Sequence, residues 1–319
     1  MKKTYKIIFV CIFITIVLLT ILNIKPKNSR QDKVIRVLYT ADLTGAPILV
    51  MQKLDLIKKY DSAIRLSVNA TSPGSAINEA IIAKQADIGH LGIPNILIGI
   101  DKGIPYKIMT SVSNTEGGIQ TNNPDIKSLK DIKPTDKISI PNLTGTSAMQ
   151  LHILALKELG DYDALKNNLI VMSDDNAVIS LINKSGITLH MTQFTYRIKE
   201  NDAGLKTIIN SSNISSEIIM EKYCVATKEF YTNNRDLYNA FYSALKDAID
   251  LINEKDERAL SIMQEEYEFD KDTLVSYLDN GYITYSYDNN NMEPYIDIAY
   301  KMGLISSKKT VNELFFKNK

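Results

Sequence analysis

Two short turns carry the residues best suited to bind a small molecule. Residues 42–45 read Asp-Leu-Thr-Gly, and residues 142–145 read Asn-Leu-Thr-Gly. Each turn follows an expected strand and opens an expected helix, where free N–H groups and a partial positive charge favour polar or anionic groups. Glycine lets the backbone approach a ligand, and threonine adds a hydroxyl donor. One such turn is more typical of an ordinary helix cap, so the repetition is what favours binding.

A third turn and two histidines extend the same pattern. Residues 72–75 read Ser-Pro-Gly-Ser and open the next expected helix. Lys84 and His90 recur as Lys184 and His190, again one hundred positions apart. We interpret this as a repeat of two lobes, with the histidines at equivalent strand ends beside the ligand. The alternative for each histidine is a buried side chain whose hydrogen bonds are satisfied within the fold.

Motifs for catalysis are missing from the chain. There is no G-x-S-x-G, no P-loop and no G-x-G-x-x-G. A metal site built from Asp42, His90 and His190 lacks the close local spacing of zinc motifs. Neighbouring carboxylates such as Asp174 and Asp175 point apart on a helix, which indicates a solvated cap. The sequence therefore predicts a binding protein with no cofactor and no metal.

Alternating strands and helices must position these turns. Strands are expected at 34–38, 64–68, 87–91 and 107–112, with helices at 45–60 and 75–84 between them. The order begins again with strands at 137–140, 169–172 and 187–191 and helices at 147–159 and 176–182. A strand at 217–226 then leads to helices at 235–253, 257–267, 271–280 and 292–302. Such βα units predict parallel sheets with covering helices, and residues 117–118, a Gly-Gly pair, are read as a crossover loop.

Composition agrees with a folded, two-domain chain. The chain has 319 residues, 45% of them hydrophobic and 23% charged. Lysine plus arginine and aspartate plus glutamate both number 37, so no basic excess points to nucleic acid. The net charge of zero is the sum of a basic N-terminal segment and an acidic remainder. Residues 1–33 hold seven basic residues and one acidic residue, and the rest hold 30 and 36.

The N-terminal segment predicts a membrane anchor. Residues 7–24 form an apolar run broken only by Thr15, Thr20 and Asn23, which is nearly long enough for a bilayer core. No A-x-A-like step follows it, so an uncleaved anchor is favoured over a cleaved signal peptide. Acylation of Cys11 is disfavoured because no small residue precedes that cysteine. Residues 25–33 are polar and basic and are read as a linker.

The order of motifs in the soluble part resembles the solute-binding proteins of nitrate/sulfonate/taurine-type ABC transporters. Residues 83–94, AKQADIGHLGIP, are followed by GIPYKI at 103–108, which is similar to the family's strand end, Gly-x-Pro turn and G-x-P segment. Residues 137–160 resemble the start of the family's second lobe. The turn after His190 departs from the family's acidic-Ala…Pro pattern, which leaves the ligand open between an anion and a small heterocycle.

The resemblance implies a two-lobed α/β fold, the type II periplasmic-binding-protein fold. Lobe one would comprise 34–118 and 222–319, and lobe two 119–221. Together with the repeat it gives a set of residues expected to contact the solute. They are Asp42, Leu43, Thr44, Gly45, Ala46, Ser72, Gly74, Ser75, His90, Leu91, Gly92, Leu143, Thr144, Gly145, Thr146, Ser147, His190, Gln193 and Phe194.

The function implied is that of a monomeric receptor on the outer face of a bacterial cytoplasmic membrane. It would close on a small polar or anionic solute, sulfonate-, nitrate- or taurine-like or pyrimidine-like, and deliver it to an ABC permease. One alternative is an enzyme on the same fold that acts on a small heterocycle. A sensor ectodomain is the other, and it is disfavoured because only six residues precede the apolar run.

Overall fold

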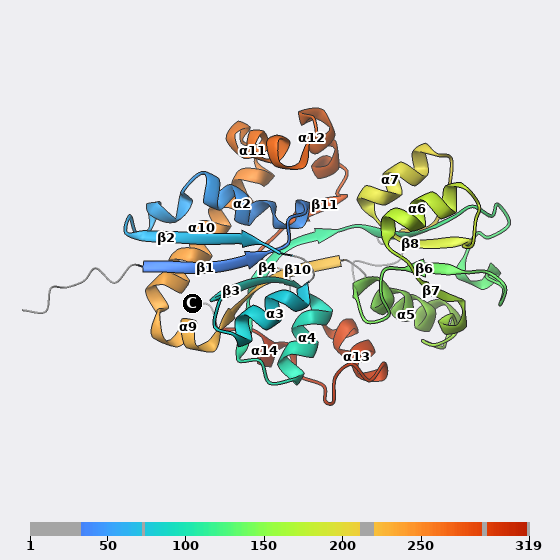
Figure 1. Ribbon diagram of the computed structural model, residues 1–319, viewed down its shortest axis with the longest axis horizontal. Helices are drawn as coiled ribbons and strands as arrows, with labels where there is room; N and C mark the ends of the chain where they lie inside the picture. Colours follow the sequence, from blue (N-terminus) through green and yellow to red (C-terminus); the bar gives the residue numbers. More distant parts are fainter. Residues whose placement is uncertain (1–32, 72–73, 211–219, 289–291, 318–319) are drawn as a thin grey trace, which may run out of the picture.

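The computed structural model describes residues 33–71, 74–210, 220–288 and 292–317. Two separate sheets, each with helices on its faces, lie side by side along the long axis of the molecule (Figure 1). We call the six-stranded sheet and its helices lobe 1, and the five-stranded sheet and its helices lobe 2. The mixed α/β architecture expected from the alternating pattern is confirmed.

Lobe 1 contains strands from both halves of the chain. The strand order is β11-β4-β10-β3-β1-β2. β1 pairs in parallel with β2 and β3, whereas β10 runs antiparallel between β3 and β4. The strands are β1 (Lys33–Tyr39), β2 (Ile64–Ala70), β3 (Ile88–Gly92), β4 (Tyr106–Thr115), β10 (Met220–Thr227) and β11 (Ile283–Tyr285).

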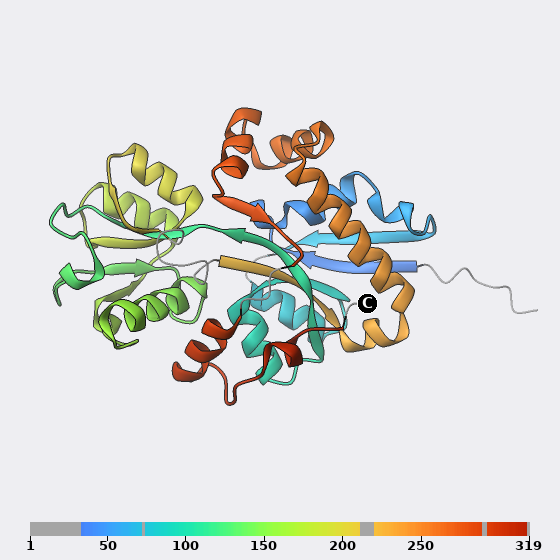
Figure 2. The same ribbon diagram turned by 180° about the vertical axis from the view of Figure 1, so that it is seen from behind.

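Helices cover both faces of this sheet, and their apolar spacing explains why. In α10, Tyr238, Phe241, Leu245, Ile249 and Ile252 are buried, a spacing of three and four that places them on one side. Figure 2 shows this long helix across the back of the sheet. It shares a core with η1 (Leu43–Gly45), α2 (Ala46–Lys53), η2 (Leu56–Lys59), α11 (Glu257–Tyr267) and α12 (Lys271–Asp279). The other face carries α3 (Gly74–Ile82), α4 (Ile93–Asp101), α13 (Glu293–Lys301) and α14 (Val311–Leu314), and α9 (Lys228–Asn233) links β10 to α10.

Lobe 2 repeats the scheme with shorter strands, in the order β7-β6-β8-β5-β9. These are β5 (Gly117–Thr121), β6 (Ile138–Ile140), β7 (Leu169–Val171), β8 (Leu189–Gln193) and β9 (Lys206–Asn210). Its helices are α5 (Thr146–Leu159), α6 (Asp174–Ile182) and α7 (Phe194–Asp202), with short 3-10 turns η3 (Leu129–Asp131) and η4 (Lys166–Asn168). Leu151 and Leu154 of α5 enter the core on one face, and Figure 1 shows α6 and α7 on the other.

The chain changes sheets at Glu116, between β4 and β5. The predicted loop at 117–118 is wrong in form, because both glycines belong to β5 and pair with β8, and Gly118 also pairs with β9. A Cβ atom on Gly118 would lie 2.7 Å from the carbonyl oxygen of Ile209, so the close strand pairing requires glycine there. The chain re-enters lobe 1 at β10.

The hundred-residue repeat is confirmed over its first half. Helices α2 and α5 begin at Ala46 and Thr146, and α3 and α6 begin at Gly74 and Asp174. Lys84 and Lys184 follow α3 and α6 with φ of 58° and 53°. Both lysines therefore end their helices in the same left-handed conformation.

The repeat then slips by one residue, so the expected equivalence of the two histidines is wrong. Three residues separate Lys84 from β3, but four separate Lys184 from β8. His90 is the third residue of β3, whereas His190 is the second of β8. A Cβ atom at Gly89 would meet Ile77 of α3, and His190 bonds to Asp174 of α6, the counterpart of α3, so His190 corresponds to Gly89. Because strand side chains alternate between faces, a one-residue slip places the two rings on opposite faces of their sheets.

Several elements lie beyond what the patterns predicted. β9, β11, α7 and α9 were not expected, and the helix expected over 45–60 is divided into η1, α2 and η2. The predicted membrane span and Cys11 lie outside the described residues. None of the helices that the structure describes is long and apolar enough to cross a bilayer.

Candidate functional site

The beginnings of α4 and α5, one from each lobe, meet between the sheets. Gly92 precedes α4 at the carboxyl end of β3, and Thr146 opens α5. A Cβ atom at Gly92 would lie 3.5 Å from the Thr146 hydroxyl oxygen. Helix beginnings present unpaired N–H groups, so these two bring donors from both lobes to one place. Gly92 and Thr146 are both in the set predicted from the sequence.

Apolar contacts beside this point join the lobes. Met149 of α5 is fully buried and belongs to the lobe 1 core that includes Leu91, Ile93 and Ile96. The Tyr162 hydroxyl in lobe 2 donates to the Lys301 carbonyl in lobe 1 at 3.4 Å. The lobes are therefore in contact on the α5 side, and Leu91 acts in this packing.

His90 supplies a buried polar atom that has no partner in the described part of the chain. Its Nδ1 lies 3.2 Å from the Thr40 hydroxyl oxygen, and its Nε2 makes no hydrogen bond there. Burial, and then the charge of Lys222, lowers the pKa of His90 well below its usual range. The ring is neutral, so Nε2 is able to donate or accept according to its tautomer.

Lys222 was missed by the sequence analysis. It lies in β10 opposite Gly92, and its Cδ would be 3.9 Å from a Cβ atom at that glycine. The side chain is half-buried, and within the described residues its ammonium has neither an ion pair nor a hydrogen bond. In the sequence this lysine follows Glu221 and precedes the uncharged run at 223–226, which is a weak signal.

Gln150 is a second missed residue. It lies one turn after Thr146 on the same side of α5, and its side chain is fully buried. Neither its amide nitrogen nor its amide oxygen has a partner in the part of the chain that the structure describes. A buried amide without partners costs free energy, so this position favours a bound water or solute group.

The first Leu-Thr-Gly turn is sealed within lobe 1. An Asp42 oxygen accepts from the Thr44 N–H at 2.9 Å and from the Thr44 hydroxyl. The hydroxyls of Ser113 and Tyr285 donate to the carbonyls of Thr44 and Leu43, at 3.0 and 2.6 Å. The donors expected to face a ligand are therefore engaged inside the protein. Ala46, which follows the turn, is fully buried.

The second turn keeps the same local bond but is open. Asn142 accepts from the Thr144 N–H at 3.2 Å, which matches Asp42 and Thr44. However, Leu143 is 52% exposed, and Thr144 is exposed as well. Gly145 caps α5, and Ser147 is buried in its first turn.

The third turn lies at the start of α3. Ser72 lies outside the described residues. Gly74 is close to the α4 side chain Asn95, whose amide nitrogen would lie 2.8 Å from a Cβ atom at Gly74. Ser75 is exposed. Their contact with a solute stays a prediction.

His190 is bracketed by two carboxylates. Its Nδ1 lies 2.6 Å from Glu200 in α7, and its Nε2 lies 3.1 Å from Asp174 at the start of α6. Burial lowers the pKa of His190, but the bonds to Asp174 and Glu200 outweigh it, so the pKa is raised. Both ring nitrogens are engaged, which indicates a structural role. Asp174, expected to be a solvated cap, is instead held by this histidine.

Gln193 and Phe194 mark a second contact between the lobes. Gln193 is the half-buried cap of α7. The buried Phe194 ring lies 5.3 Å from Tyr277 and 6.4 Å from Tyr282, both in lobe 1. Arg197, one turn later, pairs with Glu116 at the crossover. The described residues hold no group of three or more His, Cys, Asp or Glu that could bind a metal.

The architecture is the two-lobed α/β fold of periplasmic binding proteins. The chain belongs to the NMT1/THI5-like family, whose model matches residues 60–259. None of the curated proteins matches it.

Solved structures show the same fold. The periplasmic aliphatic sulphonate-binding protein SsuA of Escherichia coli is 14% identical with a TM-score of 0.74, covering 90% of this chain and 93% of its own. The alkanesulfonate-binding SsuA of Xanthomonas axonopodis pv. citri, solved bound to MOPS, is 12% identical with a TM-score of 0.70, covering 90% and 99%. The ligand-binding component of an ABC-type import system from Staphylococcus aureus, solved with zinc bound, is 16% identical with a TM-score of 0.68, covering 89% and 96%. These matches confirm the resemblance drawn from the sequence.

Proposed function

We propose that the chain is the solute-binding component of an ABC importer on the outer side of a cytoplasmic membrane. It would capture a small polar or anionic solute between the lobes and deliver it to a permease, with no catalytic step. The family match and the fold shared with sulfonate-binding proteins support the proposal. The observation that carries it is the meeting of α4 and α5 beside polar groups of His90, Lys222 and Gln150 that have no partner among the residues the structure describes.

The groups that lie where α4 and α5 meet favour a solute that has a negatively charged or strongly polar group at one end. Lys222 offers a positive charge, and the beginnings of α4 and α5 add N–H donors and a partial positive charge. His90 Nε2 and the Gln150 amide adapt to donors or acceptors on the solute. Local groups would thus attract an anion although the chain beyond residue 33 carries six more acidic than basic residues.

Closure of two lobes would complete the site. We assign residues 34–118 and 222–319 to the first lobe and 119–221 to the second. The two sheets support this division except at its edges, because residues 117–118 belong to a strand of the second sheet and residues 220–221 to a strand of the first. Opening would separate Met149 from the lobe 1 core and Phe194 from Tyr277 and Tyr282. Bending would fall on the two connections between the sheets, one of them at Glu116.

The N-terminal segment completes the proposal. We propose that residues 7–24 anchor a monomeric receptor to the membrane. The apolar run and the absence of an A-x-A-like step support an anchor over a cleaved signal.

Isothermal titration of the purified chain with alkanesulfonates, taurine, nitrate and pyrimidines tests the proposal. We expect one class to bind, and Lys222→Met to weaken an anionic solute about 10- to 100-fold, since a hydrogen bond to a charged group contributes about 1.5–3 kcal/mol. Lys206→Met, an exposed lysine of β9, is the matched control and should bind normally. Absence of heat with every compound, together with no small molecule retained in native mass spectrometry, would count against a solute-binding role.

A further inference from the structure

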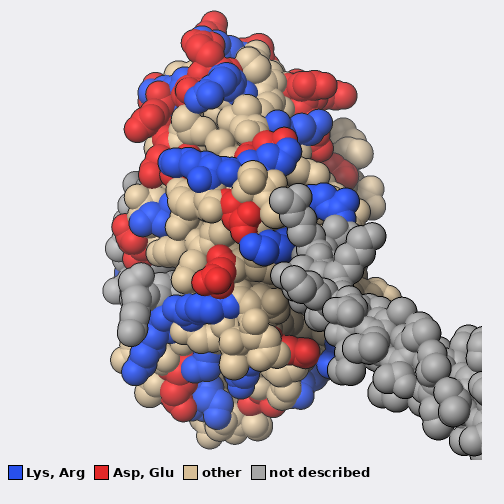
Figure 3. All heavy atoms as spheres, turned by 90° about the vertical axis from the view of Figure 1, so that its left-hand side faces the viewer, with Lys and Arg blue, Asp and Glu red and all other residues tan. Residues whose placement is uncertain are grey.

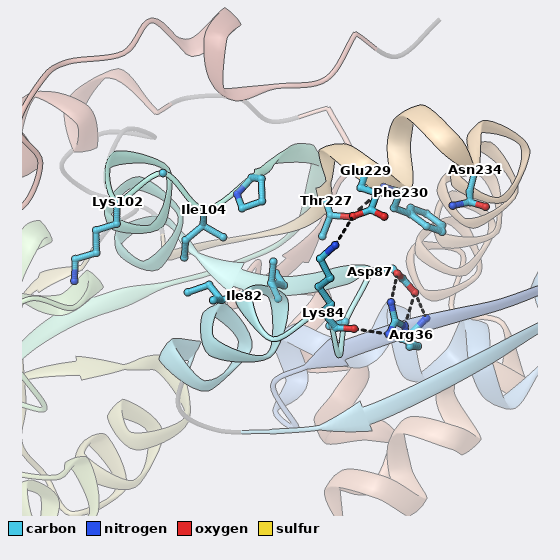
Figure 4. A pocket seen from close by; sticks show the side chains of 14 residues that line it. Arg36, Ile82, Lys84, Asp87, Lys102, Ile104, Thr227, Glu229, Phe230 and Asn234 are labelled. Carbon is cyan, nitrogen blue, oxygen red and sulfur yellow. Dashed lines mark hydrogen bonds and ion pairs between the residues drawn. The ribbon is translucent and has the colours of Figure 1, made fainter.

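A groove crosses lobe 1 at the end of the molecule remote from the meeting of α4 and α5. Three adjoining cavities form it, and the middle one encloses about 500 Å³. Figure 4 shows this middle cavity, with Arg36, Lys84, Asp87 and Phe230 on its wall. It lies where β1 and β3 begin, whereas α4 starts where β3 ends. The groove is thus separate from the candidate solute site.

The groove is strongly basic. Ten of the residues that line the three cavities are lysine or arginine, and four are aspartate or glutamate. The chain beyond residue 33 has the opposite balance, 30 basic to 36 acidic. Figure 3 looks onto this end of the molecule and shows Lys and Arg side chains spread over it, with acidic ones between them. The groove therefore has a basic excess in a chain that is acidic overall beyond residue 33.

Some of these charges are used inside the protein and others are not. Arg36 pairs with Asp87 at 2.7 Å, and Lys84 pairs with Glu229 at 3.3 Å. In contrast, the exposed side chains of Lys102, Lys228 and Lys309 make no ion pair or hydrogen bond within the described residues. These three remain available to an external anionic partner.

The position of the chain start points to the partner. Lys33, the first described residue, lines the groove. The apolar run ends at residue 24, so eight residues, three of them Lys or Arg, join it to Lys33. Eight extended residues reach at most about 28 Å. If residues 7–24 lie in a bilayer, this end of lobe 1 stays close to its surface.

We propose that this basic groove docks on a membrane surface that carries anionic phospholipid. The proposal rests on the membrane anchoring proposed above. Headgroup phosphates would meet Lys102, Lys228 and Lys309, and the exposed Ile82 at the rim would lie toward the interface. Attraction of this kind adds up over several lysines and falls off within a Debye length. Docking would hold lobe 1 in a fixed orientation and leave the point where α4 and α5 meet away from the headgroups.

Lysine footprinting of the full chain in nanodiscs tests the proposal. The nanodiscs contain phosphatidylcholine alone or mixed with phosphatidylglycerol, and acetylation rates are read by mass spectrometry. We expect Lys58 and Lys84 of the groove wall to be acetylated more slowly on the anionic nanodiscs, and high salt to abolish the difference. Lys206 in lobe 2 should react equally on both. Equal rates for Lys58 and Lys84 on the two lipids would overturn the proposal.

Matched triple variants sharpen the test. Lys102→Gln with Lys228→Gln and Lys309→Gln should remove the protection, because each lysine near an anionic surface contributes about a fivefold factor to association. Lys127→Gln with Lys130→Gln and Lys133→Gln removes three exposed lysines of lobe 2 and should preserve it. Equal loss in both triples would also overturn docking through the groove and would favour nonspecific attraction.

Failure of anchoring is distinguishable from failure of docking. A chain that does not co-elute with nanodiscs of either lipid would contradict the proposed anchor. In that case sedimentation of the full chain with phosphatidylglycerol vesicles tests the groove directly. Binding that the groove triple weakens and the lobe 2 triple does not would support docking, and no binding would overturn it.

Discussion

The two copies of the Leu-Thr-Gly turn share a local structure and differ in their surroundings. Asp42 and Asn142 both accept a hydrogen bond from the N–H of the threonine two residues later. The first copy is covered by β4 and β11, through Ser113 and Tyr285. The second copy is open, and α5 behind it reaches toward α4 of lobe 1. The repeated motif therefore specifies the same local turn in both copies. The residues packed around each turn determine whether it is accessible to a ligand.

The two histidines differ in the same way. Both ring nitrogens of His190 bond to carboxylates, those of Asp174 and Glu200, and these bonds raise its pKa. His90 has a lowered pKa, and one of its ring nitrogens has no partner in the described part of the chain. One ring stabilises its lobe, and the other is available to a solute.

The largest effect expected from this difference is on stability. His190→Leu leaves the buried Glu200 and the half-buried Asp174 without their histidine partner and should lower the free energy of unfolding by about 3–5 kcal/mol. His90→Leu loses one bond to Thr40 and should cost about 1 kcal/mol. Urea unfolding of both variants measures the two costs, and equal costs would contradict the assigned roles.

The glycines of the two turns should respond unequally to alanine. At Gly45 the new Cβ would lie 2.4 Å from the Thr40 carbonyl oxygen, which is backbone. We expect Gly45→Ala to destabilise by about 1–3 kcal/mol. At Gly145 the new atom meets the side chain of exposed Asn142, which is able to turn away, so Gly145→Ala should cost less. Thermal unfolding of the pair checks the order, and a larger loss at Gly145 would reverse our reading of which turn is sealed.

The histidines should also give opposite pH dependence. The raised pKa of His190 adds stability that is complete below the unfolded value of about 6.5 and is lost as pH rises through the folded pKa. The lowered pKa of His90 adds stability above about 6.5 that is lost as pH falls toward its folded pKa. Each slope is at most about 1.4 kcal/mol per pH unit.

Unfolding from pH 5 to pH 9 separates the two slopes. His90→Gln should flatten the acid side of the profile alone, and His190→Gln should remove the loss on the alkaline side. The overall drop in stability of His190→Gln does not affect this comparison, because the slope is what is measured. Unchanged slopes in both variants would mean that the histidines do not titrate as assigned.

The smallest expected change in stability concerns a feature that the two copies of the repeat share. Lys84 and Lys184 hold the same left-handed conformation after α3 and α6. Glycine adopts that conformation without the cost that a side chain brings. We expect Lys84→Gly and Lys184→Gly to change stability by less than about 1 kcal/mol, with similar values when measured by urea unfolding. Lys84 also loses its exposed pair with Glu229, which adds little.

Much of the fold was predictable because its signals are local. The helices at 235–253 and 257–267 match α10 and α11 residue for residue, since their apolar spacing is strong and long. β9 and β11 were missed because five and three residues carry little periodicity. β5 was read as a loop because its two glycines suit turns, and only pairing with β8 and β9 makes it a strand.

The candidate site was predictable in part. Gly92 and Thr146 were named from helix beginnings, and they lie where the lobes meet. Lys222 and Gln150 were missed because neither belongs to a turn motif. The first Leu-Thr-Gly turn and His190 were included in the predicted site. A sequence repeat does not show which hydrogen-bond donors already have partners inside the protein.

The sequence by itself determined the alternation of strands and helices, the repeated turns and the helix beginnings, because these depend on residues close together in the chain. Only the tertiary structure decided that His190 is held by Glu200 and Asp174, that the Thr44 turn is covered by Tyr285, and that Lys222 reaches Gly92. Hydrogen bonding and burial are set by residues far apart in the chain. A one-residue difference in where β3 and β8 begin sends the two histidines to opposite faces of their sheets, and only the contacts of their side chains show it.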